Sequence, residues 1–397
     1  LGRLIMRLAF VADGRSPIAR SWIEYFVRAA PEVHLISTRP CAALPGLASL
    51  EIVSLWPGSG GGGARRQRNL TAVTVLRHWI GPWMVRRRAA TLSGILRERR
   101  PDLVHALRLP FEGMLATAAR PAAPVILSTW GNDLTLHAPA SPMMRWSTHR
   151  SLRQAAGLHS DCRRDEQLAP RWGFRAARPT LVIPGNGGVR RGTFYPGRGT
   201  ADPDFGIRAS APVVVQPRGL RAYVRSETFF RAIPLIRHAQ PEAVFVCPAM
   251  EGVAEAEAWR AELAVGDSLR LLPVLDAASM GALFRRAAVS VSPSTHDGTP
   301  NTLLEAMACG CLPVAGNLES IREWVTDEEN GLLIDPRDEV ALAQAVLRGL
   351  ADEKLRRQAA VLNQRLIEER AEYDRCMKQA AAFYERVLRS GAEVDAL

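Results

Sequence analysis

Short apolar runs alternate with longer amphipathic segments along the whole chain, and the alternation occurs in two successive series. Strands that alternate with helices build parallel sheets covered by helices on both faces. The sequence therefore predicts an α/β protein with two doubly wound domains in tandem. The predicted strands are 8–12, 33–37, 103–106 and 125–129 in the first series and 213–216, 243–247, 269–272, 288–292, 312–315 and 332–334 in the second.

The stretch 195–212, which is rich in Pro and Gly, separates the two series and is typical of a linker. We expect a first domain over 1–197, a linker over 198–212 and a second domain over 213–375. Residues 353–389 show an uninterrupted helical pattern, and a C-terminal helix over 376–397 is expected to cross back to the first domain. Ligands of such sheets bind outside the carboxyl ends of the strands.

Charge divides the chain in the same way. Residues 1–200 hold 29 arginines against 11 acidic residues, a balance of +18, whereas 201–397 hold 22 basic and 29 acidic residues, a balance of −7. A basic half indicates nucleic acid, an anionic membrane surface or an acidic lipid-linked substrate as partner. The pattern of aromatic residues and glycines typical of RNA-binding motifs is missing, so we expect no nucleic acid.

The segment 65–100 contains ten arginines around Trp79 and Trp83. Arginine beside tryptophan suits an anionic membrane interface, and an exposed basic helix is the alternative. No run of about 18 uncharged apolar residues occurs, so we expect no membrane-spanning helix. The six cysteines are scattered, which predicts free thiols in a reducing cytoplasm and no zinc site.

Residues 288–325 contain the most informative pattern. A strand runs into a polar turn, Pro300 is expected as the first helical residue after a Thr299 cap, and the helix ends at Gly310. A helix that starts just past a strand presents free N–H groups and a positive dipole end, which suits phosphate. Asp297 and Glu305 then flank one ligand and can accept hydrogen bonds from its hydroxyl groups.

Here the sequence resembles the retaining glycosyltransferases of family 4. Their hallmark is a Glu, seven residues and a second Glu inside S-x-x-E-G-F-G-x-x-x-x-E-A-M-A-x-G-x-P-V, and residues 294–314 read STHDGTPNTLLEAMACGCLPV. Further matches are the PDLVHA of 101–106, the STWGND of 128–133, the PRGL of 217–220 and the NGLL of 330–333. The resemblance implies the GT-B architecture, in which two Rossmann-like domains face each other across a cleft.

The resemblance also implies roles at matching positions. Glu305 would bind the ribose hydroxyls of the donor, Asp297 the hydroxyls of the donor sugar, and the amides around Gly298 the diphosphate. Arg218 matches the arginine that binds the diphosphate. The usual lysine after it is absent, so Arg221 or Arg225 must serve, and Arg225 is favoured. The predicted donor-binding residues are Arg218, Arg225, Asp297, Gly298, Thr299, Pro300, Asn301 and Glu305.

The predicted catalytic residues are Asp297, Arg218 and Asp133, and no metal site is predicted. Asp133 would position the acceptor hydroxyl, or is a turn residue of Gly-Asn-Asp. His105, at a strand end, has a satisfied core histidine as its alternative. Asp202 and Asp204 mimic the metal-binding Asp-x-Asp of other glycosyltransferases, but Pro203 fixes the wrong backbone.

The expected function is that of a metal-independent, retaining hexosyltransferase with no cofactor. It would use a UDP-sugar or GDP-sugar as co-substrate and a sugar or lipid-linked glycan as acceptor, in the synthesis of cell-envelope polysaccharide. It would be cytoplasmic and peripheral on the inner face of the cell membrane. The alternatives are a non-catalytic, degenerate member that acts as a binding protein, and a nucleotide-sugar epimerase of the same architecture. The basic first half speaks against the epimerase.

Overall fold

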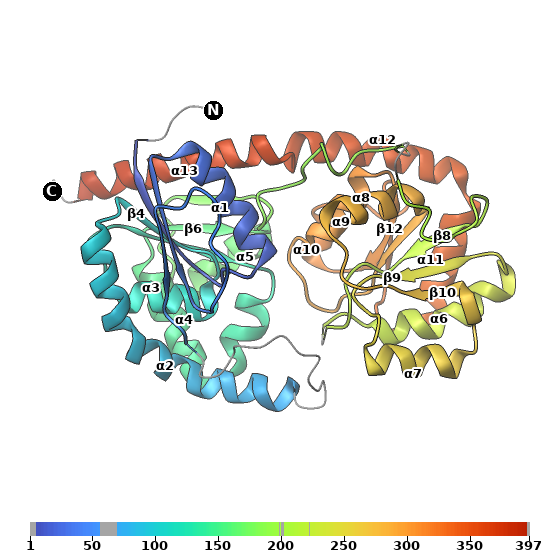
Figure 1. The fold of residues 1–397 in the computed structure, drawn as a ribbon, viewed down its shortest axis with the longest axis horizontal. Coiled ribbons are helices and arrows are strands. Elements are labelled where there is room, and N and C mark those ends of the chain that lie inside the picture. The colour runs from blue at the N-terminus through green and yellow to red at the C-terminus, as the bar shows by residue number, and fades with distance from the viewer. Residues whose placement is uncertain (1–4, 56–69, 198, 200–201, 222, 395–397) are drawn as a thin grey trace. The chain divides into compact units, whose positions relative to one another are not determined.

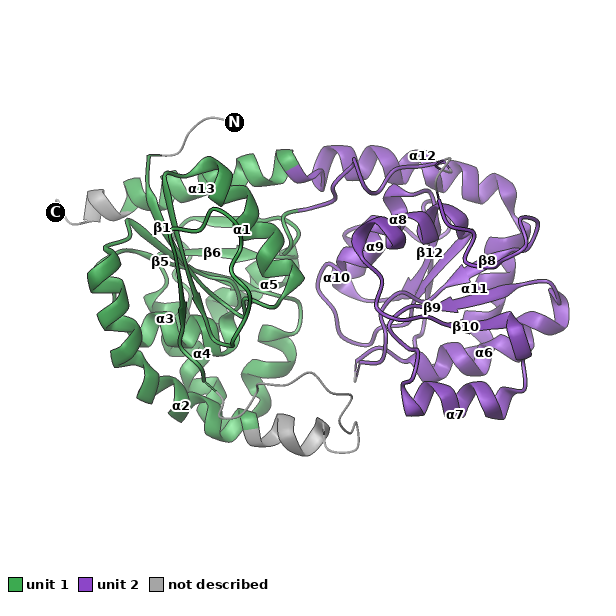
Figure 2. Cartoon of the chain, in the orientation of Figure 1, with its two compact units in different colours: residues 1–187, 374–397 green, residues 188–373 purple. Residues whose placement is uncertain are grey.

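The computed structural model describes residues 5–55, 70–197, 199, 202–221 and 223–394, with the side chains of 70–76 and 391–394 left aside. The chain divides into two compact units (Figure 2). Unit 1 comprises residues 1–187 and 374–397, and unit 2 comprises residues 188–373. Each unit is built on one parallel sheet with helices between the strands, so the predicted α/β class is confirmed.

Unit 1 contains a seven-stranded sheet in the order β3-β2-β1-β4-β5-β6-β7. Its strands are β1 (Arg7–Ala12), β2 (Glu32–Ser37), β3 (Ser49–Ile52), β4 (Leu103–Ala106), β5 (Val125–Thr129), β6 (Gly157–Ser160) and β7 (Thr180–Val182). Its α-helices are α1 (Pro17–Ala29), α2 (Leu70–Arg99), α3 (Met114–Ala118), α4 (Pro142–Gln154), α5 (Arg163–Leu168) and α13 (Tyr373–Val394). Strand order reverses direction between β1 and β4, which is where ligands of doubly wound sheets bind.

Unit 2 contains a six-stranded sheet in the order β10-β9-β8-β11-β12-β13. Figure 1 labels β8, β9, β10 and β12 of this sheet, together with the helices of the unit. Its strands are β8 (Val213–Val215), β9 (Val244–Cys247), β10 (Leu269–Leu271), β11 (Val289–Ser292), β12 (Leu312–Gly316) and β13 (Leu332–Ile334). Its α-helices are α6 (Ser226–Ala239), α7 (Ala254–Leu263), α8 (Ala277–Arg286), α9 (Asn301–Ala308), α10 (Glu319–Arg322), α11 (Glu339–Ala351) and α12 (Glu353–Arg370). Separate hydrophobic clusters bury the two faces of this sheet, one beneath α6 and α11 and the other beneath α8 and α9.

The segment expected as a linker packs on unit 2. Ile207 and Ala211 are buried in its hydrophobic core. Arg285 donates from Nε to Asp202 at 2.7 Å, which commits one acid of the Asp-x-Asp mimic to an ion pair. The compact units divide at residue 187, ten residues before the expected end of the first domain. Residues 198–212, as far as they are described, are therefore part of unit 2 and not a free connection.

The expected uninterrupted helix over 353–389 is wrong, because the chain breaks between α12 and α13. Val189 pairs with the break: its N–H donates to the carbonyl of Ala371 at 2.7 Å, and its carbonyl accepts from the N–H of Tyr373 at 3.0 Å. Gly188 has a φ of +107°, and a Cβ there would lie 2.4 Å from the Ala371 oxygen. A distant strand-like pairing interrupts the helix, and helical periodicity alone carries no sign of it.

A buried chain of hydrogen bonds ties α13 to the core of unit 1. The donors run in one direction: Trp22 Nε1 to Tyr384 Oη (2.8 Å), Tyr384 Oη to His105 Nδ1 (2.6 Å), His105 Nε2 to Ser128 Oγ (2.8 Å), Ser128 Oγ to His159 Nδ1 (2.8 Å), and His159 Nε2 to the Ile183 carbonyl (3.0 Å). This direction requires both histidines to be neutral with the proton on Nε2. Burial lowers the pKa of His159 to about 4 and that of His105 well below its usual value. His105 is thus a satisfied core histidine.

Candidate functional site

The turn between β11 and α9 forms the start of the candidate site in unit 2. The helix begins at Asn301, and Pro300 is its N-cap residue with extended backbone angles of −69° and 118°. The expectation of a Thr299 cap is therefore wrong: Thr299 Oγ1 instead accepts a hydrogen bond from Trp324 Nε1 at 2.9 Å. Among the described residues no side chain caps α9, so the amides of its first turn keep the positive end of the helix available for an anion.

Arg218 and Asp297 meet at the carboxyl ends of β8 and β11. Arg218 Nη1 lies 2.9 Å from Asp297 Oδ2, and the two side chains are only 9% and 11% exposed. Burial opposes the charge of Arg218, but Asp297 and Tyr223 together outweigh it, so the pKa of Arg218 is raised. The Gly298 amide donates to Asp297 Oδ1 at 3.2 Å, and Ser320 Oγ donates to the Asp297 carbonyl at 2.7 Å. Two predicted site residues are thus held together as a buried ion pair.

Glu305 lies on α9, one turn beyond its first residue. Burial raises its pKa to about 7, and the positive charge of Arg218 partly offsets this effect. Its neighbours Leu304 and Ala306 are buried, which keeps this part of the helix against the protein. A carboxylate that is half ionised near neutrality gains from any ligand that donates hydrogen bonds to it.

Two polar atoms in the first turn of α9 have no hydrogen-bond partner within the described part of the chain. They are Asn301 Oδ1 and Thr302 Oγ1, and both are buried. A buried polar atom without a partner is costly, so such atoms in a native protein indicate a place for a ligand or a water molecule. Asn301 was predicted; Thr302 was missed, and its position in the first turn of the helix was the available signal.

Arg221 and Arg225, the two candidates for a second cation, follow Arg218 on the loop before α6. Both side chains are exposed. The Arg225 amide donates to the Pro293 carbonyl at 2.9 Å, which holds it beside the end of β11. Arg221 Nε donates to the Arg218 carbonyl at 3.1 Å. The backbone therefore brings Arg225 to the turn that leads into α9.

Asp133, the site residue predicted in unit 1, follows β5 and is completely buried. The Trp130 amide donates to Asp133 Oδ2 at 3.0 Å, and Arg108 Nε donates to Oδ1 at 3.2 Å. Burial raises the pKa of Asp133, and Arg108 partly offsets this effect. Both carboxylate oxygens are engaged within the protein, so the side chain closes its own turn and holds Arg108.

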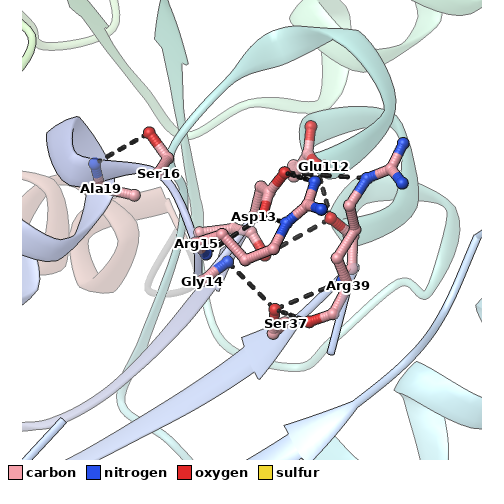
Figure 3. A network of polar contacts seen from close by, with 10 residues as sticks. Asp13, Gly14, Arg15, Ser16, Ala19, Ser37, Arg39 and Glu112 are labelled. Atoms are coloured by element: carbon pink, nitrogen blue, oxygen red, sulfur yellow. Dashed lines mark hydrogen bonds and ion pairs between the residues drawn. The ribbon is translucent and has the colours of Figure 1, made fainter. Parts of the chain in front are cut away.

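A pocket of about 380 Å³ lies in unit 1 at the carboxyl ends of β1, β2, β4 and β5. Figure 3 shows one wall, where Arg15 and Arg39 converge on Asp13. Arg15 Nη2 lies 2.8 Å and Arg39 Nε 3.7 Å from Asp13 Oδ2. Sequence reasoning missed this pocket. The available signal was an arginine soon after the end of each of three predicted strands, at Arg15, Arg39 and Arg108.

A group with ligands suited to a metal occurs elsewhere in the described part of unit 1. Single atoms of Asp161, Cys162 and Asp165 lie within 4.8 Å of one another. Arg164 Nη2 lies 2.7 Å from Asp165 Oδ1, and the Gly131 amide donates to Asp161 Oδ1 at 3.0 Å. Burial raises the pKa of the Cys162 thiol. The arginine already supplies a positive charge there, so we assign the group a structural role.

Solved structures show the same fold over nearly the whole chain. A sucrose-phosphate synthase from Thermosynechococcus elongatus superposes with a TM-score of 0.77 at 17% identity, covering 97% of this chain and 100% of the other. HepE of Anabaena, solved in complex with UDP-glucose, superposes with a TM-score of 0.72 at 16% identity, covering 96% of this chain and 99% of the other. At this identity the likeness establishes the fold, which is the expected GT-B fold of two parallel-sheet domains.

Curated relatives match parts of the chain. A D-inositol 3-phosphate glycosyltransferase of Geodermatophilus obscurus is 29% identical over 200 residues, which are 48% of this chain and 44% of the relative. A phosphatidyl-myo-inositol mannosyltransferase of Mycobacterium leprae is 30% identical over 130 residues, 32% of this chain and 34% of the relative. The matches thus span about half the length of the curated relatives or less.

Two family profiles match consecutive parts of the chain. Residues 14–185 match the glycosyl transferase 4-like domain, and residues 212–352 match the glycosyl transferases group 1. The second match includes the Arg218–Asp297 pair, Glu305 and the first turn of α9. Together with the fold, these matches show that the chain belongs to the group 1, GT4-like glycosyltransferases.

Proposed function

We propose that the chain is a retaining, metal-independent glycosyltransferase that moves a sugar from a UDP-sugar or GDP-sugar to a hydroxyl acceptor. The observation that carries the proposal is the site in unit 2: the buried Arg218–Asp297 pair, with Glu305 and two unpartnered polar atoms, at the uncapped start of α9. HepE, which shares the fold, was solved with UDP-glucose, and this favours a UDP-sugar donor.

Each group in this site has a role that suits its chemistry. Glu305 accepts hydrogen bonds from the two ribose hydroxyls of the donor, and Asp297 accepts from the hydroxyls of the donor sugar. Arg218 and the backbone N–H groups of Gly298, Thr299 and Asn301 hold the diphosphate, whose two negative charges need cations or helix N–H groups. Thr299 and Pro300 shape the turn, and Arg225 adds a second positive charge on the solvent side.

The proposed reaction needs no covalent intermediate with the protein. The bond from the anomeric carbon to the diphosphate oxygen breaks, and a bond to the acceptor oxygen forms on the same face. The acceptor proton passes to the departing diphosphate, so the charges balance without a separate base. Arg218 and the start of α9 stabilise the negative charge that develops on the leaving group. Asp133 acts from unit 1 as a positioning residue, because it fixes Arg108 beside the pocket there.

The experiment is a transfer assay with α-linked UDP-sugars and GDP-sugars and a panel of sugar acceptors, run with excess EDTA. The anomeric coupling constant of the product, measured by NMR, reports the stereochemistry. An α-linked product formed in EDTA supports the proposal. A β-linked product, or activity that returns only with added Mg²⁺ or Mn²⁺, contradicts the mechanism. Nucleotide binding without any transfer would indicate a binding protein, and conversion of the donor into its epimer would indicate an epimerase.

We further propose a lipid-linked glycan of the cell envelope as acceptor, reached at the cytoplasmic face of the membrane. The support is a surface of unit 1, the α2–α4 surface, on which Trp79, Trp83 and Trp146 are about half exposed. Arginines stack on two of these rings: the Arg86 guanidinium lies 4.7 Å from the ring of Trp146, and that of Arg87 lies 3.9 Å from the ring of Trp83. Of the predicted segment 65–100, residues 65–69 lie outside the described residues.

No helix in the described ranges is both long and apolar enough to cross a membrane. Binding through the α2–α4 surface would instead depend on charge. Replacing Arg86, Arg87 and Arg88 by Glu should weaken binding to vesicles of anionic lipid, since each basic residue near such a surface contributes about 1 kcal/mol. Co-sedimentation of the triple variant and the parent at several salt concentrations measures it. Equal binding would remove this surface from the membrane proposal.

A further inference from the structure

Arginine dominates the pocket at the carboxyl ends of the strands of unit 1. Its described lining includes four arginines and two carboxylates, namely Arg15, Arg39, Arg77, Arg108, Asp13 and Glu112. The two carboxylates already have partners: Asp13 bonds to Arg15 and Arg39, and Glu112 accepts from Thr38 Oγ1 at 2.7 Å. Asp133, behind the wall, balances Arg108. Counting Asp133 with the lining still leaves one positive charge in excess.

The two histidines of the pocket add no charge, but they continue a chain of hydrogen bonds that starts at Arg108. Arg108 can only donate, so its contact of 3.3 Å with His137 requires His137 Nε2 to accept. The proton of His137 is then on Nδ1, which donates to His78 Nε2 at 3.1 Å. His78 therefore carries its proton on Nδ1. Burial and the nearby arginines lower the pKa of His137 to about 3, and that of His78 is lowered too, so both rings stay neutral.

Arg77 stacks in this pocket on the ring of Phe111, a residue with a strained backbone. Its guanidinium lies 5.1 Å from the centre of the Phe111 ring. Phe111 has a φ of +69°, a region that non-glycine residues seldom adopt and that clusters at functional sites. A Cβ on Gly81 would lie 2.1 Å from this ring, so a glycine is needed at 81 to admit it. The strained backbone of Phe111 and the glycine at position 81 together allow the Phe111 ring to stack against Arg77.

The arginines of the pocket also act on one another. Burial lowers the pKa of Arg77, and the positive charges of Arg39 and Arg108 lower it further against the opposing effect of Glu112. Three guanidinium groups are therefore close enough to repel. A bound anion would relieve this repulsion and would receive several charge-assisted hydrogen bonds. Arginine is the residue suited to this task, because its planar fork binds phosphate and carboxylate groups through two parallel hydrogen bonds.

We infer that this pocket binds an oxyanion, a phosphate or a carboxylate, carried by the acceptor sugar. The assignment of this ligand as the acceptor rests on the proposed function, whereas the binding of an oxyanion does not. A volume of about 380 Å³ falls within the range of roughly 300–1,000 Å³ usual for small-molecule sites, which leaves room for one charged sugar unit. Arg39, Arg77 and Arg108 bind the oxyanion, and His78 donates a further hydrogen bond.

The first test is a calorimetric titration of the whole chain with inorganic phosphate. The parent should bind phosphate, and Arg77→Gln and Arg39→Gln should each weaken binding about 10- to 100-fold, as expected for losing a charge-assisted hydrogen bond. Arg171→Gln, an exposed arginine of the same unit, is the matched control and should bind like the parent. Arg218→Gln alters the diphosphate site proposed in unit 2, so this variant should still show the phosphate-binding site that Arg77→Gln weakens. Phosphate binding lost in Arg218→Gln and kept in Arg77→Gln would overturn the inference.

The second test compares the binding of glucose, glucose 6-phosphate and glucuronate. At least one charged sugar should bind more than tenfold tighter than glucose, and Arg77→Gln should abolish the preference. A preference for glucose 6-phosphate identifies a phosphate site, and one for glucuronate a carboxylate site. Equal binding of all three sugars by parent and variant would refute the inference. Because these readouts need no donor, they remain informative if the transfer assay fails.

Discussion

Two groups of buried polar residues in this molecule differ in how far their hydrogen bonds are satisfied. In unit 1, the chain from Trp22 through Tyr384 to His159 gives each of its linking donors and acceptors a partner inside the protein. In unit 2, the start of α9 leaves Asn301 Oδ1 and Thr302 Oγ1 without a partner among the described residues. The first group is closed and the second is open.

The difference indicates what each group is for. A closed network in a dry core stabilises one arrangement of the elements that carry it, here the docking of α13 on the sheet of unit 1. In an open network, the free-energy cost of the unpartnered polar atoms is offset only when a ligand supplies the missing hydrogen-bond partners. Damage to the closed chain should therefore reduce stability, whereas damage to the open site should reduce binding and transfer.

The largest effect is expected from Arg218→Gln, which breaks the open site at its ion pair. Loss of a group that stabilises the leaving diphosphate should lower the transfer rate about 10²- to 10³-fold. Single-turnover kinetics at saturating donor, with circular dichroism as a check on folding, measures it. Arg260→Gln, which removes an exposed cation of α7 in the same unit, is the control. A variant of Arg218 with more than half the parent rate would rule out its role.

The next effect in size is expected from Tyr384→Phe, which interrupts the closed chain. It leaves the Trp22 N–H and His105 Nδ1 without partners, at about 1–3 kcal/mol for each buried group. Urea denaturation should show the loss, while nucleotide affinity stays as in the parent. Ser390→Ala removes an exposed hydrogen bond from the same helix and should cost little. A Tyr384→Phe variant that is as stable as the parent but binds nucleotide more weakly would show that this chain serves binding and not stability.

A smaller effect on the free energy of unfolding is expected from pH, and its sign is opposite for Glu305 in the open site and His159 in the closed chain. The pKa of Glu305 rises from 4.5 to about 7 on folding, so its stabilising contribution is complete below pH 4.5 and is lost as pH rises through 7. The pKa of His159 falls from 6.5 to about 4, so its contribution is present above pH 6.5 and is lost as pH falls through 4.

Glu305→Gln tests the first of these signs. Between pH 4.5 and 8 the free energy of unfolding of the variant should gain on that of the parent by up to about 3 kcal/mol. Denaturation at several pH values without nucleotide measures the difference. Glu262→Gln, on the exposed face of α7, should show no such trend. A pH-independent difference for Glu305→Gln would mean that this carboxylate is not desolvated.

Much of the fold could be predicted from the sequence because buried parallel strands are short apolar runs. The bounds predicted for β4, β5 and β13 match the observed ones. The strands β3, β6 and β7 were missed: β3 and β7 are short edge strands, and β6 (GLHS) carries a glycine and two polar residues. Its His159 is polar yet buried, because partners from other strands satisfy it, and local periodicity cannot show such partners.

The candidate site, like the fold, could be predicted from the sequence only in part. The motif around Asp297 and Glu305 is local in sequence, and a strand followed by a helix puts both at one sheet edge, so it could be predicted. The capping of α9 could not, because the partner of Thr299 is Trp324 on a later segment. The pocket of unit 1 was missed for a similar reason: its arginines come from four separate segments that only the sheet brings together.

The most direct measurement of the central claim is a calorimetric titration of the parent, Glu305→Ala and Tyr384→Phe with UDP and with GDP. The parent should bind at least one of the two nucleotides. Glu305→Ala should lose about 2–4 kcal/mol of that binding, roughly 30- to 1,000-fold in affinity, because a desolvated carboxylate no longer meets the ribose hydroxyls. Tyr384→Phe should bind like the parent. If neither nucleotide binds the parent, or if Glu305→Ala binds as tightly as the parent, the open site at α9 is not a nucleotide-sugar site.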